Sequence, residues 1–163
     1  MLLRLKDKDT LIVDQFIFKC SVGKNGVKKK RKEGDKITPK GIYSLGKLYY
    51  RSDRVKKPLT KLSTKKITKD MGWCDDPNHI LYNKEVKIDN KKKYEKLFRK
   101  DNSYDYLIVI NYNIKNILAN KGSAIFIHLT KNYEHTAGCI ALKKKDFLIL
   151  SQIININSKI KIN

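Results

Sequence analysis

The sequence predicts a mainly β fold, a sandwich or barrel that carries one or two short helices. Three observations support this prediction. Tyr106–Tyr112 is almost continuously apolar, as expected of a buried central strand. Thr10–Cys20 is rich in Ile, Val and Phe, and Ile42–Tyr50 has a strand pattern rich in Tyr and Leu. By contrast, Lys91–Lys100 and Lys143–Ile154 have apolar residues at helical spacing.

The first half of the chain is expected to alternate between strands and polar loops. Thr10–Cys20 forms one or two strands, and Ser21–Lys36, with several glycines and the basic run KKKRK, forms a loop. Thr38–Gly41 is a turn that precedes the next strand. Arg51–Asp70 is polar and irregular, and His79–Ile88 has the pattern of a short strand pair.

The second half is expected to contain better-defined elements. Ala124–Leu129 alternates as a strand does, so that Ala124, Phe126 and His128 share one face. Lys159–Ile162 closes the chain with alternating isoleucines. The helix expected at Lys143–Ile154 has one face made of Phe147, Leu150, Ser151 and Ile154. We expect the whole chain, residues 1–163, to form a single domain, because this length is ordinary for one domain.

The formal net charge of +21 raises the question of a nucleic-acid partner. The excess is nearly all lysine, it is spread along the chain, and aromatic residues rarely interrupt the lysine runs. Asparagine and isoleucine are also abundant, as codon drift in an AT-rich genome would produce. We therefore expect a solvated, lysine-rich surface and no specific nucleic-acid partner, while an attraction to anionic polymers of the cell wall stays open.

The chain carries few signals of cellular compartment. No apolar run reaches transmembrane length, and the first residues, MLLRLKDKDTLIV, lack the apolar region and cleavage site of a signal peptide. The expected location is therefore the cytoplasm, or outside it by a route that the sequence does not reveal. The cysteines Cys20, Cys74 and Cys139 form no CxxC pair, and an odd number leaves at least one thiol outside any disulfide. Cys20 ends an apolar run and is expected to be a buried, inert thiol, while the pairing of Cys74 stays open.

The pattern with the clearest chemical meaning is a histidine in a strand followed by a Gly-Cys turn, His128 and Gly138-Cys139. A base that takes the thiol proton makes cysteine a nucleophile, so Cys139 is the candidate nucleophile and His128 the candidate base. Gly138 would let the backbone N–H groups of the turn point at a developing oxyanion. A backbone carbonyl could orient the imidazole, and a helix close behind Cys139 would help to hold a thiolate. The alternatives are a structural cysteine and a core histidine.

Other residues are candidates for the base or for substrate contacts. His135 is a rival base, although its polar loop favours a contact with solvent or substrate, and His79 ranks last because no thiol is near it in sequence. Trp73 and Asp75 lie in a loop that could contact a substrate, or they could be a core anchor and a turn. Arg51 could bind a carboxylate bidentately or belong to a surface ion-pair cluster.

The segment HLTKNYEHTAGCIAL, which begins at His128, resembles the catalytic signature of the L,D-transpeptidase (YkuD-type) family. That signature is a histidine, a variable loop and then Ser/Thr-His-Gly-Cys followed by an apolar residue. Upstream, Gly34-Asp35 and Thr38–Tyr43 (TPKGIY) resemble the turn that precedes a core strand in the family. The chain departs from the pattern at Ala137, which replaces the histidine before glycine, and at Ala141, where many members have arginine.

The resemblance implies a β-rich catalytic domain and acyl transfer on peptidoglycan stem peptides. Cys139 would attack the carbonyl between an L- and a D-centre of a tetrapeptide stem and expel D-alanine. His128 would be the general base, and the backbone of Gly138 and Cys139 would form part of the oxyanion hole. The candidate substrate-binding residues are Thr136, which matches the Ser/Thr of the motif, His135, Trp73, Asp75 and Arg51.

The resemblance also implies partners and a location. No metal or other cofactor is expected, and carbapenems are expected to react with the same thiol. The acyl acceptor stays open, since an amine gives transpeptidation and water gives carboxypeptidase action. The substrate class implies the bacterial cell envelope (periplasm), where the protein is expected to act as a monomer.

Several other classes compete with this interpretation. A sortase-like transpeptidase needs an arginine after the cysteine, and none follows Arg99. Papain-like and NlpC-type peptidases place cysteine before histidine, and no histidine follows Cys139. A non-catalytic, lysine-rich module for anionic polymer or nucleic acid remains an alternative, as does an inactive member of the same fold. Salt-sensitive binding that is indifferent to Cys139→Ala would support the binding module.

Overall fold

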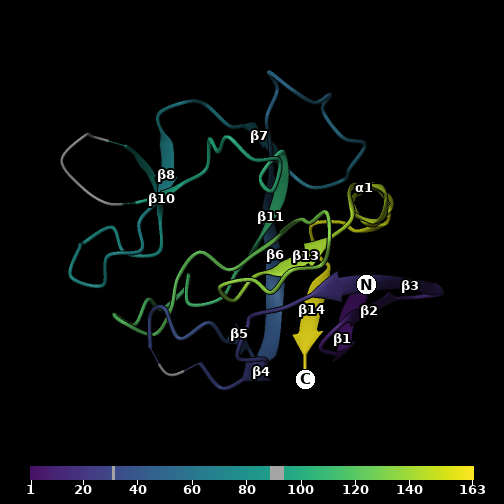
Figure 1. Cartoon of the computed structure of the whole chain (residues 1–163), viewed down its shortest axis with the longest axis horizontal. Coiled ribbons are helices and arrows are strands. Elements are labelled where there is room, and N and C mark those ends of the chain that lie inside the picture. The colour runs from purple at the N-terminus through teal and green to yellow at the C-terminus, as the bar shows by residue number, and fades with distance from the viewer. Residues whose placement is uncertain (31, 89–93) are drawn as a thin grey trace.

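A computed structural model of the chain describes residues 1–30, 32–88 and 94–163 (Figure 1). Within these residues the regular secondary structure is mostly strand, with one helix of ten residues. The elements, in chain order, are β1 (Leu2–Asp7), β2 (Thr10–Val13), β3 (Phe16–Ser21), β4 (Val27–Lys28), β5 (Thr38–Pro39), β6 (Gly41–Tyr50), β7 (Thr64–Lys66), β8 (Met71–Trp73), β9 (Glu85–Lys87), β10 (Glu95–Lys96), β11 (Tyr106–Ile110), β12 (Phe126–Leu129), β13 (Ile140–Leu142), α1 (Lys144–Ile153) and β14 (Lys159–Ile162).

Nine of the described strands form one sheet that closes on itself. Its order is β11-β12-β13-β3-β2-β1-β14-β6-β7, and β6 also pairs with β11. The length of β6 makes this closure possible, because β14 pairs with its first half and β11 with its second half. In Figure 1, β6 and β11 run through the centre of the molecule, with β14 beside β6 and β1, β2 and β3 to one side. The sheet is barrel-like, which confirms the predicted mainly β fold.

The side chains of β12 alternate between two apolar clusters. Ile125, Ile127 and Leu129 belong to the larger cluster, which draws residues from most strands of the closed sheet and from α1. Phe126 belongs to a smaller cluster on the opposite face of β12. The predicted alternation is therefore confirmed. The strand begins at Phe126 and not at Ala124 as predicted, because Ala124 has a φ of +51°, which lies outside the β region.

Several predicted elements are confirmed. Thr10–Cys20 holds β2 and all but the last residue of β3, and Ile42–Tyr50 lies within β6. The apolar segment that starts at Tyr106 forms β11, whose residues are all buried and which lies between β6 and β12. Both isoleucines of β14 are buried. The buried residues of α1 are Phe147, Leu150 and Ser151.

Two predictions of local structure are wrong. Residues 94–100 do not continue a helix but contain β10, which pairs with β8; residues 91–93 lie outside the described part of the chain. Leu97, whose spacing suggested the helix, is fully buried in the smaller cluster instead. His79–Ile88 does not form a strand pair: the residues before Glu85 form turns, and the strand within this range, β9, pairs with β8.

The loops also contain more structure than expected. Ser21–Lys36 contains β4, which pairs in parallel with β5 at the start of the predicted turn, and Arg31 of its basic run lies outside the described residues. Arg51–Asp70 contains β7, which pairs with β6. The helix expected close behind Cys139 is separated from it by β13 and begins at Lys144. The helix terminus is therefore not adjacent to the thiol in sequence.

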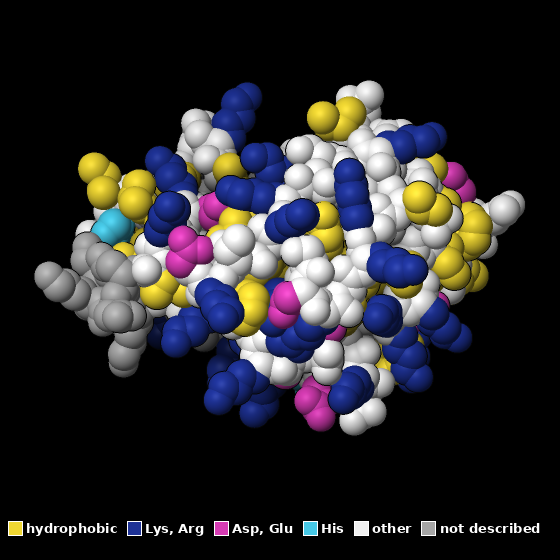
Figure 2. Space-filling model, turned by 90° about the horizontal axis from the view of Figure 1, so that it is seen from above, with side chains coloured by type: hydrophobic (Ala, Val, Ile, Leu, Met, Phe, Trp, Pro, Cys, Tyr) yellow, Lys and Arg dark blue, Asp and Glu magenta, His cyan; other side chains and the backbone are white. Residues whose placement is uncertain are grey.

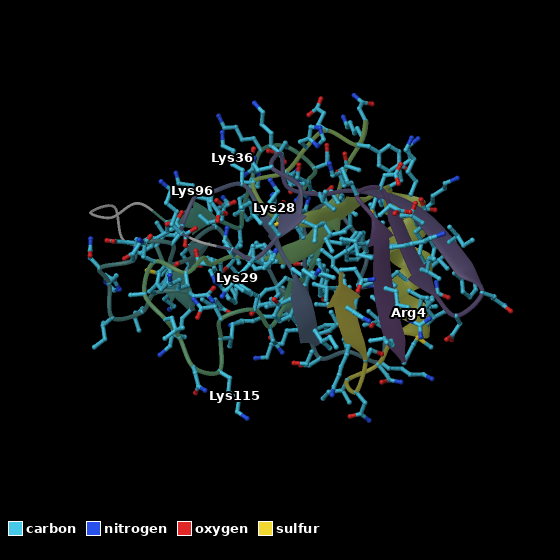
Figure 3. All side chains as sticks on the ribbon, turned by 90° about the horizontal axis from the view of Figure 1, so that it is seen from below. Arg4, Lys28, Lys29, Lys36, Lys96 and Lys115 are labelled. Atoms are coloured by element: carbon cyan, nitrogen blue, oxygen red, sulfur yellow. The ribbon has the colours of Figure 1, made fainter. Side chains whose placement is uncertain are left out.

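Lysine and arginine side chains are distributed over the surface. Figure 2 shows them interspersed with neutral and apolar side chains over the face in view. From the opposite side, Lys96 on β10 lies in the left part of the view and Arg4 on β1 in the right part, and the labels of Lys28 and Lys36 fall between them (Figure 3). The basic charge is thus spread over several elements. None of the described helices has the length and apolar character needed to cross a membrane.

Candidate active site

The strands β12 and β13 bring Cys139 and His128 to one face. They are parallel, with Ile127 opposite Ile140 and His128 opposite Ala141. Since side chains alternate along a strand, Cys139 faces the same side as Ala141, and therefore the same side as His128. The candidate nucleophile and base are diagonal neighbours on adjacent strands. Both line one pocket with a volume of about 790 Å³.

The sulfur of Cys139 is held by the backbone that leads into β12. The Phe126 N–H donates to Sγ at 3.3 Å, and the thiol donates to the Ala124 carbonyl at 3.2 Å. Only 7% of Cys139 is exposed, and the residue lines the pocket. Burial raises the pKa of the Cys139 thiol to about 12. The resting side chain is therefore a neutral thiol whose proton is directed to a backbone carbonyl.

His128 is oriented by a backbone carbonyl as well. Its Nδ1 lies 2.9 Å from the carbonyl oxygen of Leu129. Because a carbonyl can only accept, Nδ1 carries the proton in the neutral ring, and Nε2 is the nitrogen that can act as a base. Burial lowers the pKa of His128 to about 4. At neutral pH the imidazole and the thiol are therefore both uncharged.

Two threonines hold the turn before Cys139. The Thr136 hydroxyl donates to the Cys139 carbonyl at 2.6 Å and accepts the Gly138 N–H at 3.1 Å. The Thr38 hydroxyl donates to the Gly138 carbonyl at 2.9 Å. Gly138 has a φ of +143°, and a Cβ there would lie 2.9 Å from the Ile37 carbonyl oxygen, so the position requires glycine. Since Thr136 engages the Gly138 N–H, the Cys139 N–H is the better candidate for an oxyanion donor.

One wall of the pocket comes from residues that sequence reasoning missed. Tyr104 packs edge-on against His128, with ring centroids 5.3 Å apart, and its hydroxyl donates to Glu95 Oε1 at 2.9 Å. The Arg99 guanidinium lies 5.1 Å from the Tyr104 ring centroid and 2.8 Å from Asp101. This segment is lysine-rich and has no motif. Its one useful signal is that Tyr104 lies two residues before the start of the most apolar strand.

Charged groups of both signs line the pocket. The acidic lining residues are Glu95, Asp101, Asp105 and Glu134, and the basic ones are Arg99, Lys131 and Lys144. Acidic residues are the minority in this chain, which has 37 lysines and arginines but 16 aspartates and glutamates. The pocket is therefore relatively rich in carboxylates for a protein of this composition.

Two of the candidate substrate-binding residues reach the pocket. Thr136 and His135 both line it, and His135 is exposed. Trp73, Asp75 and Arg51 are not among the described lining residues.

These three residues have other surroundings. Trp73 is buried, donates through Nε1 to Asn83, and packs edge-on against Phe126, so it is a core anchor. Arg51 is also buried, and it pairs bidentately with Asp53 at 2.8 Å and stacks on a phenylalanine ring. Asp75 is partly buried, and desolvation raises the pKa of its carboxyl. No substrate role follows for them from this geometry.

The remaining cysteines and histidine lie elsewhere. None of the three cysteines, all of which lie in the described part of the chain, forms a disulfide, and Cys20 and Cys74 are buried. Burial raises the pKa of the Cys20 thiol to about 12, as expected of an inert thiol. His79 accepts the Leu81 N–H at 3.0 Å in a turn and is not among the described pocket residues.

The closed sheet and the pocket define a β-rich protein with a candidate cysteine–histidine site. Residues 2–162 match the family model of the L,D-transpeptidase catalytic domain (YkuD). The chain therefore belongs to this family of enzymes, which act on peptidoglycan, and the predicted resemblance is confirmed. No curated protein matches the chain.

Proposed function

We propose that this chain is one catalytic domain that transfers the acyl group of a peptidoglycan stem peptide through a thioester on Cys139, with His128 as general base. The observation that carries the proposal is that β12 and β13 present both side chains to one pocket. Family membership supports the substrate class. Since that substrate lies in the bacterial cell envelope, we propose the envelope as the site of action.

In the first half-reaction the Cys139 sulfur attacks the carbonyl carbon that joins the L-centre of the stem to D-alanine. The thiol proton passes to Nε2 of His128, and the carbonyl oxygen becomes an oxyanion, for which we assign the Cys139 N–H as a donor. The C–N bond then breaks, the imidazolium returns the proton to the leaving nitrogen, and D-alanine departs. Because burial keeps both groups neutral at rest, the proton moves as the sulfur attacks.

In the second half-reaction we propose an amine as the acyl acceptor. Its nitrogen attacks the thioester carbonyl, His128 takes a proton from that nitrogen, and the sulfur leaves and recovers its proton, so an amide replaces the thioester. The carboxylates of the pocket wall, including Glu95 and Glu134, favour the approach of a cationic amine, which releases one proton to solvent before its neutral nitrogen attacks. Water in the same position would give a free carboxylate and carboxypeptidase action.

Intact-mass spectrometry after incubation with a carbapenem tests the nucleophile. We expect a covalent adduct on the wild type and on Cys74→Ala, which removes another buried thiol as a matched control. The adduct should be absent from Cys139→Ala and should form more slowly on His128→Ala. An adduct that persists in Cys139→Ala, or none on any form, would contradict the proposal. Stem-peptide assays with and without an added amine then separate transfer from hydrolysis.

A further inference from the structure

We propose that Asn83 is a positioning residue for Cys139 and that it acts through the backbone of Ala124. This inference rests on the proposed function, because it concerns the orientation of the nucleophile in that reaction. Asn83 is not among the described residues that line the pocket. Its influence on the sulfur therefore passes through the groups that contact the sulfur, Ala124 and Phe126.

The polar atoms of the Asn83 side chain are all engaged. Oδ1 accepts the Ala124 N–H at 3.1 Å and the Trp73 indole N–H at 2.9 Å. Nδ2 donates to the carbonyls of Tyr112 at 3.0 Å and Asn113 at 2.8 Å. Asn83 is only 2% exposed, so water has little access to replace these bonds. One buried amide thus joins β8, the loop after β11 and the segment that leads into β12.

Ala124 has a backbone conformation that needs support. Its φ of +51° lies in the left-handed region, which residues with a Cβ rarely adopt. In this conformation its N–H donates to Asn83 and its carbonyl accepts the Cys139 thiol at 3.2 Å. Relaxation to a negative φ would rotate the peptide groups on either side of Ala124. The bond from Ala124 to Asn83 therefore helps to keep the carbonyl next to the sulfur.

Asn83 also supports the second contact to the sulfur. The Trp73 indole that it binds packs edge-on against Phe126, with ring centroids 5.2 Å apart. Phe126 provides the N–H that donates to Cys139 Sγ at 3.3 Å. β8, which carries Trp73, lies to the side of β11 and β6 in Figure 1, so Asn83 connects an outlying strand to the site.

Loss of the Asn83 amide should alter Cys139 in two ways. A carbonyl accepts a hydrogen bond from a thiol but not from a thiolate, so the Ala124 carbonyl favours the protonated form. If this carbonyl moves away, the pH midpoint for alkylation of Cys139 should fall. Acylation should nevertheless become slower, because a displacement of about 1 Å at a reacting atom can cost about a hundredfold in rate.

Two substitutions separate these effects from general damage. Asn83→Gly removes the side chain but tolerates the φ of +56° at this position. Asn83→Asp keeps an acceptor for the Ala124 N–H, adds a negative charge, and removes the Nδ2 donor to the Tyr112 and Asn113 carbonyls. Alkylation with iodoacetamide is followed over a range of pH, with peptide mapping to separate Cys139 from Cys20 and Cys74, and the rate of acylation by a carbapenem is measured alongside.

We expect Asn83→Gly to lower the alkylation midpoint of Cys139 and to slow acylation by about tenfold to a hundredfold. Asn83→Asp should leave the midpoint unchanged or raise it, because the acceptor is kept and the added charge disfavours a thiolate. Two results would overturn the proposal: an alkylation midpoint and acylation rate in Asn83→Gly equal to those of the wild type, or an equal decrease of the midpoint in both variants. A residue with only a structural role would change stability without this difference between the two midpoints.

Hydrogen exchange on the wild type provides a test that does not depend on the variants folding. The Ala124 amide should be protected, and exchange at the rate of an exposed loop amide would overturn the positioning role. The outcome for the proposed function is separate. If no acyl-enzyme forms on the wild type but the midpoint still falls in Asn83→Gly, the positioning role stands and the proposed function fails.

Discussion

The Thr38 hydroxyl donates a hydrogen bond of 2.9 Å to the carbonyl of Gly138, which lies 100 positions later in the chain. The same hydroxyl accepts the Gly23 N–H at 2.8 Å, and Thr38 is fully buried. This bond joins the TPKGIY segment to the turn before Cys139. The two sequence features that carried the family resemblance therefore meet in space, and Thr38 helps to set the position of the candidate nucleophile.

Thr38→Val should destabilise the protein, because it keeps the shape of the side chain but leaves the Gly138 carbonyl and the Gly23 N–H without this partner. A buried polar group that loses its partner costs about 1–3 kcal/mol. Urea unfolding measures the loss, and Thr38→Ser is the control, since it retains the hydroxyl. Equal free energies of unfolding for the Val and Ser variants would contradict this role of Thr38.

Gly138→Ala should reduce both stability and acylation. The φ of +143° is essentially restricted to glycine, and the new Cβ would meet the Ile37 carbonyl oxygen at 2.9 Å. We expect a loss of about 1–3 kcal/mol in unfolding free energy from the backbone conformation alone. Gly34→Ala is a matched control, because Gly34 also has a positive φ but a Cβ there has no atom within 4 Å. A variant at Gly138 that is as stable and active as the one at Gly34 would show that this turn tolerates a side chain.

The rate of acylation should depend on pH through His128. Burial lowers the pKa of His128 to about 4, and only the neutral imidazole can accept the thiol proton. The second-order rate constant for acylation should therefore stay high on lowering the pH through 6.5 and fall as the pH approaches about 4. A fall centred near 6.5, the ordinary pKa of histidine, would mean that the imidazole is solvated or charged at rest.

The free energy of unfolding should also depend on pH through His128. The unfolded chain, with an ordinary histidine pKa of 6.5, takes up a proton before the folded chain does, whose His128 pKa is about 4. The contribution of neutral His128 to the free energy of unfolding is therefore complete above pH 6.5 and is lost as the pH falls through about 4. Urea unfolding at several pH values should show a weaker pH dependence in His128→Gln than in the wild type across this window. Identical slopes would rule out a depressed pKa at His128.

Glu95→Gln should make the Cys139 thiol more reactive. The Glu95 carboxylate is one of the charges that raise the pKa of this thiol, after the larger effect of burial. We expect alkylation of Cys139 at alkaline pH to become roughly twofold to tenfold faster, which corresponds to a pKa decrease of up to about one unit. Glu134→Gln, which also removes a carboxylate from the pocket lining, is the control. Equal acceleration in both variants would point to the net charge of the pocket as the cause.

Lys30→Met should cost far more stability than Lys65→Met. Lys30 pairs with Asp35 at 2.6 Å, and both side chains are 2% exposed, whereas the Lys65 side chain, paired with Glu85, is 42% exposed. Removing one partner of a buried pair costs about 3–5 kcal/mol, and an exposed pair contributes about 0–1 kcal/mol. Thermal or urea unfolding of the two variants measures the difference. Similar losses would mean that the Lys30–Asp35 pair is solvated.

Much of the fold could be predicted because its strands show their burial in the sequence. β11 is apolar throughout, and β12 alternates between two clusters, so local pattern and tertiary packing agree. The helix predicted around Leu97 is wrong because the apolar residues there pack into the smaller cluster from a two-residue strand and the irregular segment that follows it. Local spacing cannot distinguish such packing from a helix face.

The site was predictable where a short motif determines it and not where distant segments build it. The placement of Cys139 and His128 on one face follows from two neighbouring strands. Tyr104 and Asn83 reach the site through contacts between segments that are far apart in the chain. Tyr104 is marked only by its place near the start of the most apolar strand, and no local motif marks Asn83. The sequence left Trp73 open as a substrate contact or a core anchor, and local pattern could not separate the two; in the structure it is buried against Phe126.

The central claim, a thioester on Cys139, is tested most directly by mass spectrometry of the protein quenched during turnover of a tetrapeptide stem. The proposed function predicts a covalent adduct with the mass of the stem less D-alanine, and peptide mapping should locate it on Cys139. The adduct should be absent from Cys139→Ala. Turnover of the stem by Cys139→Ala at the wild-type rate, or an adduct on another residue, would contradict the claim.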